Sequence, residues 1–284
     1  MKPRENQQIT LVTGANSGMG KATSLAFAKL GTHVVMMCRN KEKGEAARQE
    51  VVSESGNHSV DLHICDLGNL EDIRQFAQTF NLNYPKLDVL INNAAIITTK
   101  RKETGDGFEL QFGVNHLGPF LLTNLLLEKL KTASSARIIN VSSGAHKIGT
   151  IDFNDLQTQH KKYRTFSVYG QSKLANILFT NELARRLEDT NITANSLHPG
   201  AVATNLGIDR ETGFGKTIVR MLRPFFKTPE EGADTAIYLA TSPEVAGVSG
   251  KYFINRKVVK TKKAEDPTVA KKLWEVSEKL VGLR

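Results

Sequence analysis

Short apolar runs alternate with longer amphipathic stretches along the whole chain. Runs rich in β-branched residues predict strands, and segments with apolar positions three and four residues apart predict helices. The predicted strands cover residues 9–13, 33–38, 59–65, 89–92, 137–142, 192–197 and 251–254. The predicted helices cover residues 18–30, 41–54, 69–80, 107–131, 165–188 and 229–240.

This alternation predicts the fold class. Strands that are separated by helices pair as parallel neighbours through right-handed crossovers. The pattern therefore predicts an α/β protein in which residues 1–284 form a single domain. Its core would be a doubly wound (Rossmann) sheet of about seven parallel strands flanked by helices. Ligands of such sheets bind outside the carboxyl ends of the strands, which is where we look for chemistry.

Two segments depart from the alternation. Residues 202–227 mix apolar and basic side chains. They predict an amphipathic excursion, interpreted as a substrate lid, a membrane-surface contact or a packed surface helix. Residues 255–284 form a basic C-terminal tail, and from residue 251 onward ten Lys or Arg stand against four Asp or Glu. The tail lacks the pattern of a nucleic-acid-binding module, so we favour a solvated basic face over a closing helix and expect no nucleic-acid partner.

The overall composition is that of an ordinary globular protein, with 40% hydrophobic and 24% charged residues among 284. Residues 1–8 are polar and lack the apolar core of a secretory signal. No window approaches the ~18 apolar residues of a membrane-spanning helix. We therefore expect a cytoplasmic protein without a transmembrane segment, and leave peripheral membrane contact open.

The cysteines and histidines predict no metal chemistry. Cys38 and Cys65 each close an apolar run and are expected to be buried free thiols, because a disulfide is disfavoured in a reducing compartment. Neither these two cysteines nor the seven histidines have the spacing of metal ligands. The sequence thus predicts neither a structural nor a catalytic metal.

A glycine-rich loop follows the first predicted strand and opens the first predicted helix. Its spacing is Gly-x-x-x-Gly-x-Gly. Glycines there let the backbone approach a pyrophosphate, and the helix that follows offers free amide groups and the positive end of its dipole. An ordinary strand-to-helix turn is the alternative interpretation. The residues expected to contact a dinucleotide are Gly14, Ala15, Asn16, Ser17, Gly18, Met19 and Gly20.

Tyr169 and Lys173 lie four residues apart in a predicted helix. Side chains at this spacing share one helix face, so the phenol and the ammonium can point into the same space. A fixed cation favours the phenolate and is expected to lower the pKa of the tyrosine toward the working range of an acid–base catalyst. On its own, the pair could equally be a chance occurrence on a solvated face.

Several motifs in a fixed order identify a family. They are residues 13–20, residues 92–95, Asn115, Ser142-Ser143, Tyr169-x-x-x-Lys173 and His198-Pro199-Gly200. Over nearly its whole length the chain resembles the short-chain dehydrogenase/reductases. Residues 38–40, residues 114–118 and the long insert between Ser143 and Tyr169 resemble the retinol dehydrogenase-type branch. Two departures are Ala95, where the family usually has glycine, and the missing hydrophobic anchor of many animal members.

The resemblance implies hydride transfer between a nicotinamide and a carbonyl or alcohol carbon. Tyr169 would act as general acid in reduction and as general base in oxidation, with Lys173 lowering its pKa and binding the nicotinamide ribose. Ser143 would stabilise the charge on the substrate oxygen, and Asn115 would position a relay water. Because adjacent strand residues face opposite ways, only one of the two serines can serve. Ser142 is expected to be packed or bonded to the backbone.

The same resemblance assigns the remaining cofactor contacts. After the second strand the chain has Arg39 and no acidic residue until Glu42, which favours NADP(H), with NAD(H) as the alternative. Asp66 resembles the adenine-binding aspartate, and Thr204 resembles the residue that holds the carboxamide. The full set beyond the glycine loop is Arg39, Asn40, Asp66, Leu67, Asn93, Ala94, Tyr169, Lys173, Pro199, Gly200, Val202 and Thr204.

The leading interpretation is an NADP-dependent carbonyl reductase or alcohol dehydrogenase for a lipophilic aldehyde, ketone or alcohol. One alternative is a double-bond reductase similar to the protochlorophyllide reductases, which rely on more cysteines than this chain has. Another is a non-catalytic NADP-binding sensor or scaffold. Family members commonly pair through two long helices, here residues 107–131 and 165–188, so the resemblance also implies a homodimer or homotetramer.

Overall fold

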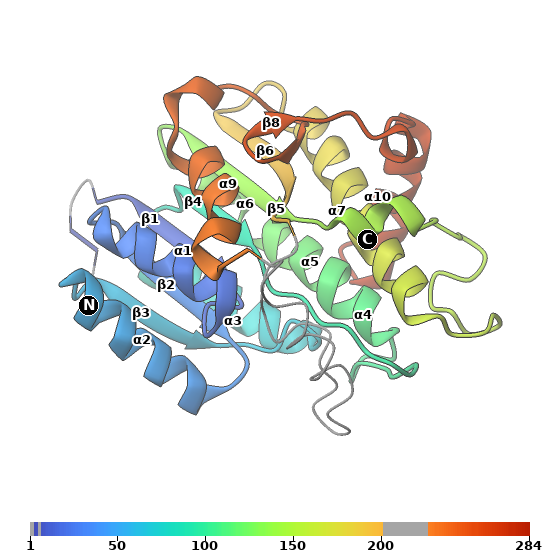
Figure 1. Ribbon diagram of the computed structural model, residues 1–284, viewed down its shortest axis with the longest axis horizontal. Helices are drawn as coiled ribbons and strands as arrows, with labels where there is room; N and C mark the ends of the chain where they lie inside the picture. The colour runs from blue at the N-terminus through green and yellow to red at the C-terminus, as the bar shows by residue number, and fades with distance from the viewer. Residues whose placement is uncertain (1–2, 5–6, 201–226) are drawn as a thin grey trace.

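Eight strands form one sheet at the centre of the computed structural model, which describes residues 3–4, 7–200 and 227–284 (Figure 1). The strand order is β3-β2-β1-β4-β5-β6-β7-β8, and every neighbouring pair is parallel except β7 and β8. The strands are β1 (Ile9–Thr13), β2 (His33–Cys38), β3 (Val60–Ile64), β4 (Val89–Asn92), β5 (Ala136–Val141), β6 (Ile192–His198), β7 (Tyr252–Ile254) and β8 (Lys257–Val258). The predicted Rossmann-type α/β fold is confirmed.

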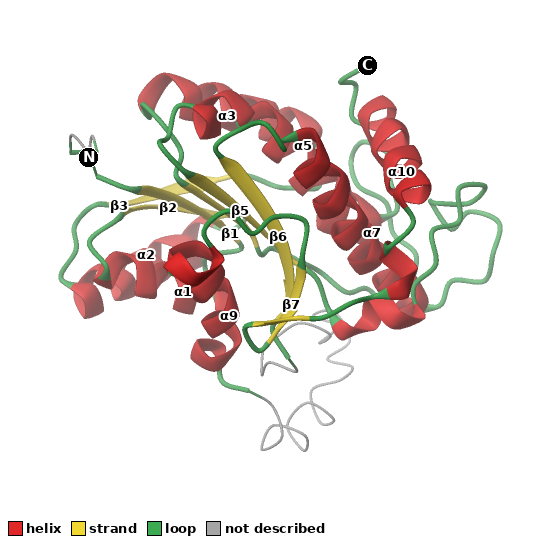
Figure 2. Cartoon of the chain, turned by 90° about the horizontal axis from the view of Figure 1, so that it is seen from above, coloured by secondary structure: helices red, strands yellow, loops and turns green. Residues whose placement is uncertain are grey.

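Helices cover both faces of the sheet (Figure 2). One face carries α1 (Gly18–Lys29), α2 (Lys41–Ser55) and α9 (Pro229–Thr241). The other carries α3 (Leu70–Asn83), α5 (Gly118–Leu125), α7 (Thr165–Arg186) and α10 (Pro267–Leu280). Each layer buries its apolar side against the sheet, which explains why β1, β2 and β4 are mostly apolar and are buried throughout their length.

The eighth strand is absent from the sequence prediction. β7 turns back on itself into β8, with Ile254 opposite Lys257. The two residues between them, Asn255 and Arg256, both have positive φ (49° and 62°). A two-residue hairpin loop requires this backbone, and asparagine is one of the few residues that adopt it readily.

The predicted helix over residues 107–131 is wrong as a single element. The segment divides into α4 (Leu110–Phe112), a π-helical turn η1 (Gly113–Leu117), α5, and α6 (Leu127–Lys131). Pro119 lacks the amide hydrogen that an uninterrupted α-helix would donate to the carbonyl of Asn115. The backbone hydrogen bonds therefore change from the α-helical to the wider π-helical pattern just before Pro119. Such π turns are common at functional sites.

The closing helix expected in the basic C-terminal segment is present as α10. Helix α10 packs beside α7, with the Trp274 ring 4.9 Å from that of Phe120 and 5.7 Å from that of Phe179. The Nε2 of His116 and the hydroxyl of Ser277 are 2.9 Å apart. Thus α10 of the same chain lies against α5 and α7, the helices through which we expected two copies to pair.

Two further expectations concern residues away from the sheet edge. Cys38 and Cys65 are buried and unpaired, as predicted. Burial raises the pKa of both thiols, that of Cys65 to about 12, which makes them unreactive. Within residues 3–4, 7–200 and 227–284, the helices are all too short or too polar to cross a bilayer.

Candidate active site

The glycine loop joins β1 to α1 at the carboxyl edge of the sheet. Gly14 and Gly18 have positive φ, 65° and 52°, which side chains other than glycine rarely adopt. A Cβ atom on Gly14 would lie 2.9 Å from the Cα of Ala94, and one on Gly20 would lie 2.2 Å from the carbonyl oxygen of Gly14. The loop is therefore a cradle that larger residues would fill or distort.

The start of α1 has unused hydrogen-bond donors. Ser17 occupies the N-cap position with extended backbone, yet its side chain makes no capping bond, and the first turn holds no acidic residue. Free amides and an unengaged hydroxyl at the positive end of the helix dipole suit an anion such as a phosphate. The backbone amide of Ala15 donates to the carbonyl of Met37 at 3.1 Å, which attaches the loop to the sheet.

The loop after β4 is tied to the glycine loop. The hydroxyl of Thr13 accepts from the backbone amides of Asn93 and Ala94, at 2.9 and 3.0 Å. The Asn93 side-chain amide donates to the carbonyl of Thr13 at 2.8 Å. Strands β1 and β4 are neighbours on opposite sides of the point where strand order reverses. The predicted loop residues therefore meet where a dinucleotide binds in doubly wound sheets.

Arg39 and Asp66 lie at the ends of β2 and β3, with Nη1 and Oδ2 3.6 Å apart. Both side chains are partly exposed, so the pair contributes little to stability and can open toward a ligand. The side chain of Asn40 accepts from Lys43 and caps α2, while Asp66 accepts from the amide of Gly68. Leu67 is buried.

The other predicted catalytic groups come together around the start of α7. Tyr169 and Lys173 are both buried, and the Lys173 ammonium lies 5.7 Å from the centre of the Tyr169 ring. Tyr169 hydrogen-bonds the Ser143 side chain. Lys173 donates to the carbonyl of Val141 at 3.0 Å, which holds its stem against β5. A buried phenol, a buried amine and the partly exposed hydroxyl of Ser143 therefore lie together.

The pKa of Tyr169 is shifted upward, opposite to the direction expected from the sequence. Burial raises the pKa of Tyr169 to about 12, although the bond to Ser143 opposes the rise. Burial also lowers the pKa of Lys173 to about 7. Removing a side chain from water penalises its charged form, and for Tyr169 that penalty exceeds the effect of the bond to Ser143. The lowering of the phenol pKa by Lys173 stays a prediction.

The depressed pKa of Lys173 predicts a pH dependence of stability. Between about pH 7 and the ordinary lysine value, the unfolded chain binds a proton that the folded chain does not, so rising pH stabilises the fold. We expect the free energy of unfolding of the wild type to gain up to about 1.4 kcal/mol per pH unit over that of Lys173→Met. Urea titrations of the cofactor-free proteins at pH 7 and pH 9 measure it. If the free energies of unfolding of the two proteins change equally with pH, the lowered pKa of Lys173 is contradicted.

Ser142 and Ser143 face opposite ways. The Ser142 hydroxyl is buried and donates to the carbonyl of Lys173 at 2.7 Å, a bond to the backbone as expected. Ser143 caps a short 3-10 helix, η2 (Gly144–Ile148), by accepting from Ala145. Of the two hydroxyls, only that of Ser143 reaches Tyr169.

The loop after Ser143 packs directly on α7. A Cβ atom on Gly149 would lie 2.2 Å from the carbonyl oxygen of Gly170, and one on Gly170 would lie 2.6 Å from that of Ala145. Backbone therefore touches backbone at this glycine seam, formed by Gly149 and Gly170. Because Gly170 follows Tyr169 directly, the seam fixes the spacing between Ser143 and Tyr169.

Asn115 lies in the π turn, and its side chain is fully engaged. It accepts from the amide of Ile96 at 2.8 Å and donates to the Ile96 carbonyl and the Ser172 hydroxyl, each at 3.0 Å. The amide thus joins the loop after β4 to α7. Any water held by this residue would have to use its main-chain carbonyl, the group that Pro119 leaves without an α-helical donor.

The last predicted cofactor segment follows β6. Gly200 has φ 92°, and a Cβ there would lie 2.9 Å from the side chain of Lys227. The amide of Gly200 donates to Nδ1 of His198 at 3.4 Å. Pro199 and Gly200 end the described part of this segment. Val202, Thr204 and residues 202–226 of the proposed lid lie outside the described residues.

Two histidines beside Ser143 were not predicted as site residues. His146 donates from Nδ1 to the carbonyl of Ser143 at 2.7 Å and accepts from the Thr261 hydroxyl at 3.0 Å. The His198 ring lies beside Gly144, and burial lowers its pKa to about 4. Both histidines are therefore neutral near pH 7. No local signal marks His146, because its partner Thr261 is far away in the sequence.

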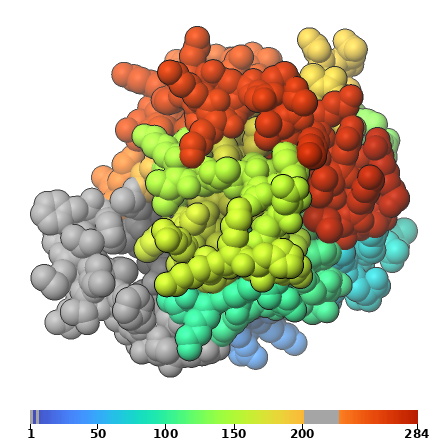
Figure 3. All heavy atoms as spheres, turned by 90° about the vertical axis from the view of Figure 1, so that its right-hand side faces the viewer, coloured from blue at the N-terminus to red at the C-terminus, as the bar shows by residue number. Residues whose placement is uncertain are grey.

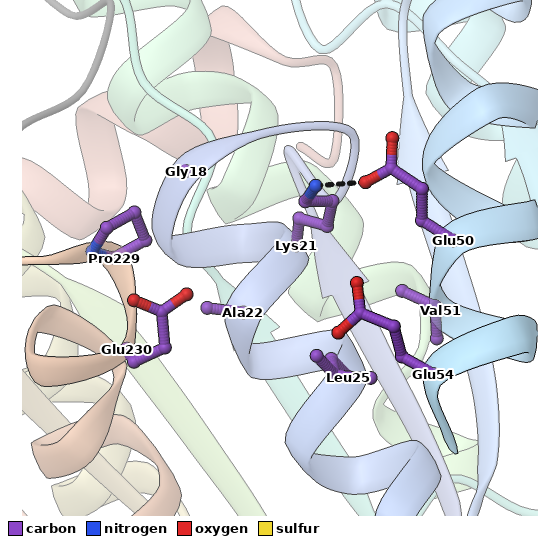
Figure 4. Close-up of a pocket in the computed structure, with 9 residues that line it drawn as sticks. All are labelled: Gly18, Lys21, Ala22, Leu25, Glu50, Val51, Glu54, Pro229 and Glu230. Carbon is purple, nitrogen blue, oxygen red and sulfur yellow. Dashed lines mark hydrogen bonds and ion pairs between the residues drawn. The ribbon is translucent and has the colours of Figure 1, made fainter.

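A separate pocket of about 260 Å³ opens between α1, α2 and α9 (Figure 4). Gly18 borders it, but Glu50, Glu54 and Glu230 line it, and Lys21 is paired with Glu50. Lys21, which could have assisted phosphate binding, is thus engaged on this side of α1. The carboxylates disfavour a phosphate, so we assign the pocket no cofactor role.

Fold and site together define a class: an α/β oxidoreductase that binds a dinucleotide beside a Tyr–Ser–Lys cluster. Comparisons with known proteins support an oxidoreductase of this fold. A sequence profile for the family described as short chain dehydrogenase matches residues 8–213. The chain belongs to the short-chain dehydrogenase family.

Within the family, the chain is a retinol dehydrogenase-like oxidoreductase. It is 49% identical to human retinol dehydrogenase 13 over 97% of this chain and 85% of that protein. With human retinol dehydrogenase 14 the identity is 48%, over 97% and 87%. The solved structure of an uncharacterised protein from Mycobacterium Paratuberculosis superposes with a TM-score of 0.78 at 33% identity, covering 99% of this chain and 96% of that one.

Proposed function

We propose that the chain is an NADP-dependent oxidoreductase that interconverts the carbonyl and alcohol forms of a lipophilic substrate. The observation that carries the proposal is the cluster of Tyr169, Ser143 and Lys173 at the carboxyl edge of the sheet, in which Tyr169 and Lys173 are buried and Ser143 is partly exposed. A protein that only sensed the dinucleotide would have no need of a buried phenol and a buried amine beside a hydroxyl.

In this proposal Tyr169 is the proton donor during reduction. A pKa of about 12 keeps the phenol protonated at neutral pH, and its hydrogen bond with Ser143 aims both hydroxyls at one point. Ser143 would donate to the substrate oxygen as negative charge develops on it. Lys173, buried and anchored on Val141, would resupply the proton. Asn115 would act by holding Ile96 and Ser172 around this space.

The cofactor supplies or accepts the hydride when it is bound. The free amides and the Ser17 hydroxyl at the start of α1 would hold its pyrophosphate. Asp66, Asn93 and Ala94 would border the adenosine, and Arg39 would pair with the additional phosphate that distinguishes NADP from NAD. We keep Val202 as a cofactor contact and Thr204 as the residue that holds the carboxamide, as the family resemblance implies.

A lipophilic substrate is supported by the relatives and by the surface. The similar human proteins are named retinol dehydrogenases. The exposed side chains of Ile148 and Phe166 flank the loop after Ser143 and the start of α7. We therefore propose retinoids or other long apolar aldehydes, ketones and alcohols as the substrate class.

Cofactor choice provides the test. We expect aldehyde, ketone and retinoid substrates to be reduced with NADPH in preference to NADH. In Arg39→Ala, kcat/KM for NADPH should fall about 10- to 100-fold while that for NADH changes little, because one charge-assisted contact to phosphate is lost. Initial rates of NADPH and NADH oxidation measure both.

Lys43→Ala, which removes an exposed cation on the first turn of α2, is the matched control. It should leave the ratio of kcat/KM for NADPH to kcat/KM for NADH unchanged. Equal use of NADPH and NADH by the wild type would refute the cofactor assignment. An absence of turnover with every substrate and both cofactors would refute the proposed reaction.

A further inference from the structure

Exposed apolar side chains gather beside the candidate active site. Among the described residues, seven large apolar side chains are exposed, and four of them surround the loop after Ser143. Ile148 is in that loop and is 58% exposed. Phe166, 65% exposed, lies one turn before Gly170, which touches Gly149. Val258 and Val259 are on and after β8.

Three contacts bring the β8 segment next to this loop. Thr261 donates to His146, and the Lys263 ammonium donates to the carbonyl of Gly149 at 2.8 Å. The rings of His146 and Tyr252 meet at 5.1 Å, and Val259 donates to the carbonyl of Tyr252. Residues 144–149 and 257–263 thus lie side by side, and Figure 3 shows them adjacent on one face of the molecule.

The same two segments are strongly basic. They carry Lys147, Lys257, Lys260, Lys262 and Lys263, all exposed, and no carboxylate. Among the acidic residues that follow these segments, Asp152 pairs with Lys161 and the Asp266 side chain caps α10, whereas Glu265 is exposed. One exposed carboxylate beside five exposed lysines leaves the surface strongly positive. We call the combined surface the basic rim: Lys147, Ile148, Phe166, Lys257, Val258, Val259, Lys260, Lys262 and Lys263.

We propose that the basic rim docks the protein on an anionic membrane surface. Lysines attract the negative headgroups, while exposed aliphatic and aromatic side chains enter the boundary with the acyl chains. A second copy of the chain is a poor occupant, because a two-fold axis through the rim would bring like charges together. The inference rests on the proposed function and deepens it, since Lys147 and Ile148 of the rim lie in the loop after Ser143 and the rim would draw a lipophilic substrate from the bilayer.

Vesicle binding tests the inference without relying on turnover. The full chain, free of cofactor and substrate, should sediment with vesicles of phosphatidylcholine and phosphatidylserine and not with phosphatidylcholine alone. Raising the salt concentration should weaken binding. In the triple variant Lys147→Gln, Lys260→Gln, Lys262→Gln, partitioning should fall about 100-fold, since each lysine contributes roughly fivefold. Val258→Ser with Val259→Ser should also weaken binding, because both side chains are exposed on the rim.

The opposite face of the sheet provides matched controls. Lys29→Gln, Lys41→Gln and Lys43→Gln remove three exposed cations, and Leu30→Ser removes an apolar side chain that is 61% exposed. These variants should bind the vesicles nearly as the wild type does. Equal losses in rim and control variants, or no dependence on phosphatidylserine, would overturn the inference. So would a concentration-dependent dimer that the rim variants abolish.

The two proposals fail separately. Rim variants should retain wild-type turnover of a water-soluble aldehyde, because the rim lysines and valines contact none of the reacting groups. If the wild type does not bind anionic vesicles, the docking surface is refuted and the proposed reaction is unaffected. An inactive protein that still binds anionic vesicles would refute the reaction and keep the docking surface.

Discussion

Tyr169→Phe is expected to lower kcat by about 10²- to 10⁴-fold, the range that a positioned general acid contributes. The substitution removes one oxygen atom and keeps the buried ring, so the surrounding packing is preserved. Ser143 loses its partner, and the substrate oxygen loses its proton donor. The Kd for NADPH, measured by fluorescence titration, should stay close to the wild-type value, because the ring still fills its place beside Lys173.

Tyr84→Phe is the matched control. Tyr84 is also a buried tyrosine whose pKa burial raises, but its hydroxyl donates to Asp61, on the β3 side of the sheet. Its removal should affect stability and leave turnover unchanged. Wild-type turnover by Tyr169→Phe would refute the role of Tyr169. A large loss in both variants would point to a general structural effect instead.

Trp274→Ala is expected to lower the free energy of unfolding by about 3–5 kcal/mol, the usual cost of truncating a buried aromatic side chain. The Trp274 side chain is 4% exposed and packs against Phe120 and Phe179. The guanidinium of Arg186 lies 4.2 Å from its ring. The variant would detach α10 from α5 and α7. Urea titration or thermal unfolding of the cofactor-free protein measures the loss.

Trp274→Phe separates ring packing from polar contacts. The indole Nε1 of Trp274 is buried and has no hydrogen-bond partner among the described residues. Phenylalanine keeps an aromatic ring and removes that unsatisfied donor, so the loss should stay below about 1.5 kcal/mol. A loss in Trp274→Phe as large as in Trp274→Ala would show that ring packing is not what holds α10 in place.

The sequence predicted the sheet and the arrangement of its loops because those signals are local. All seven parallel strands lie where apolar β-branched runs predict them, within two residues at each end. The glycine loop was recognisable because Gly14 and Gly18 serve a backbone conformation that few other residues adopt. The spacing of Tyr169 and Lys173 likewise places both side chains on one face of α7.

The remaining features depend on contacts distant in sequence. A run of helical residues does not reveal that Pro119 widens the ladder around Asn115. Strand β8 has two residues, too few for a periodic pattern. The pKa of Tyr169 depends on burial, which only the folded chain determines. Pairing of two copies through α5 and α7 stays a prediction, and any such dimer must accommodate α10.

The glycine seam has a consequence for altering this enzyme by mutagenesis. Ser143 and Tyr169 are spaced by main chain rather than by exchangeable side chains, so their geometry is insulated from most substitutions. Directed-evolution libraries should leave Gly149 and Gly170 untouched. Diversity introduced at Ile148 and Phe166 would reshape the approach to the reacting groups while the distance between the two hydroxyls is conserved.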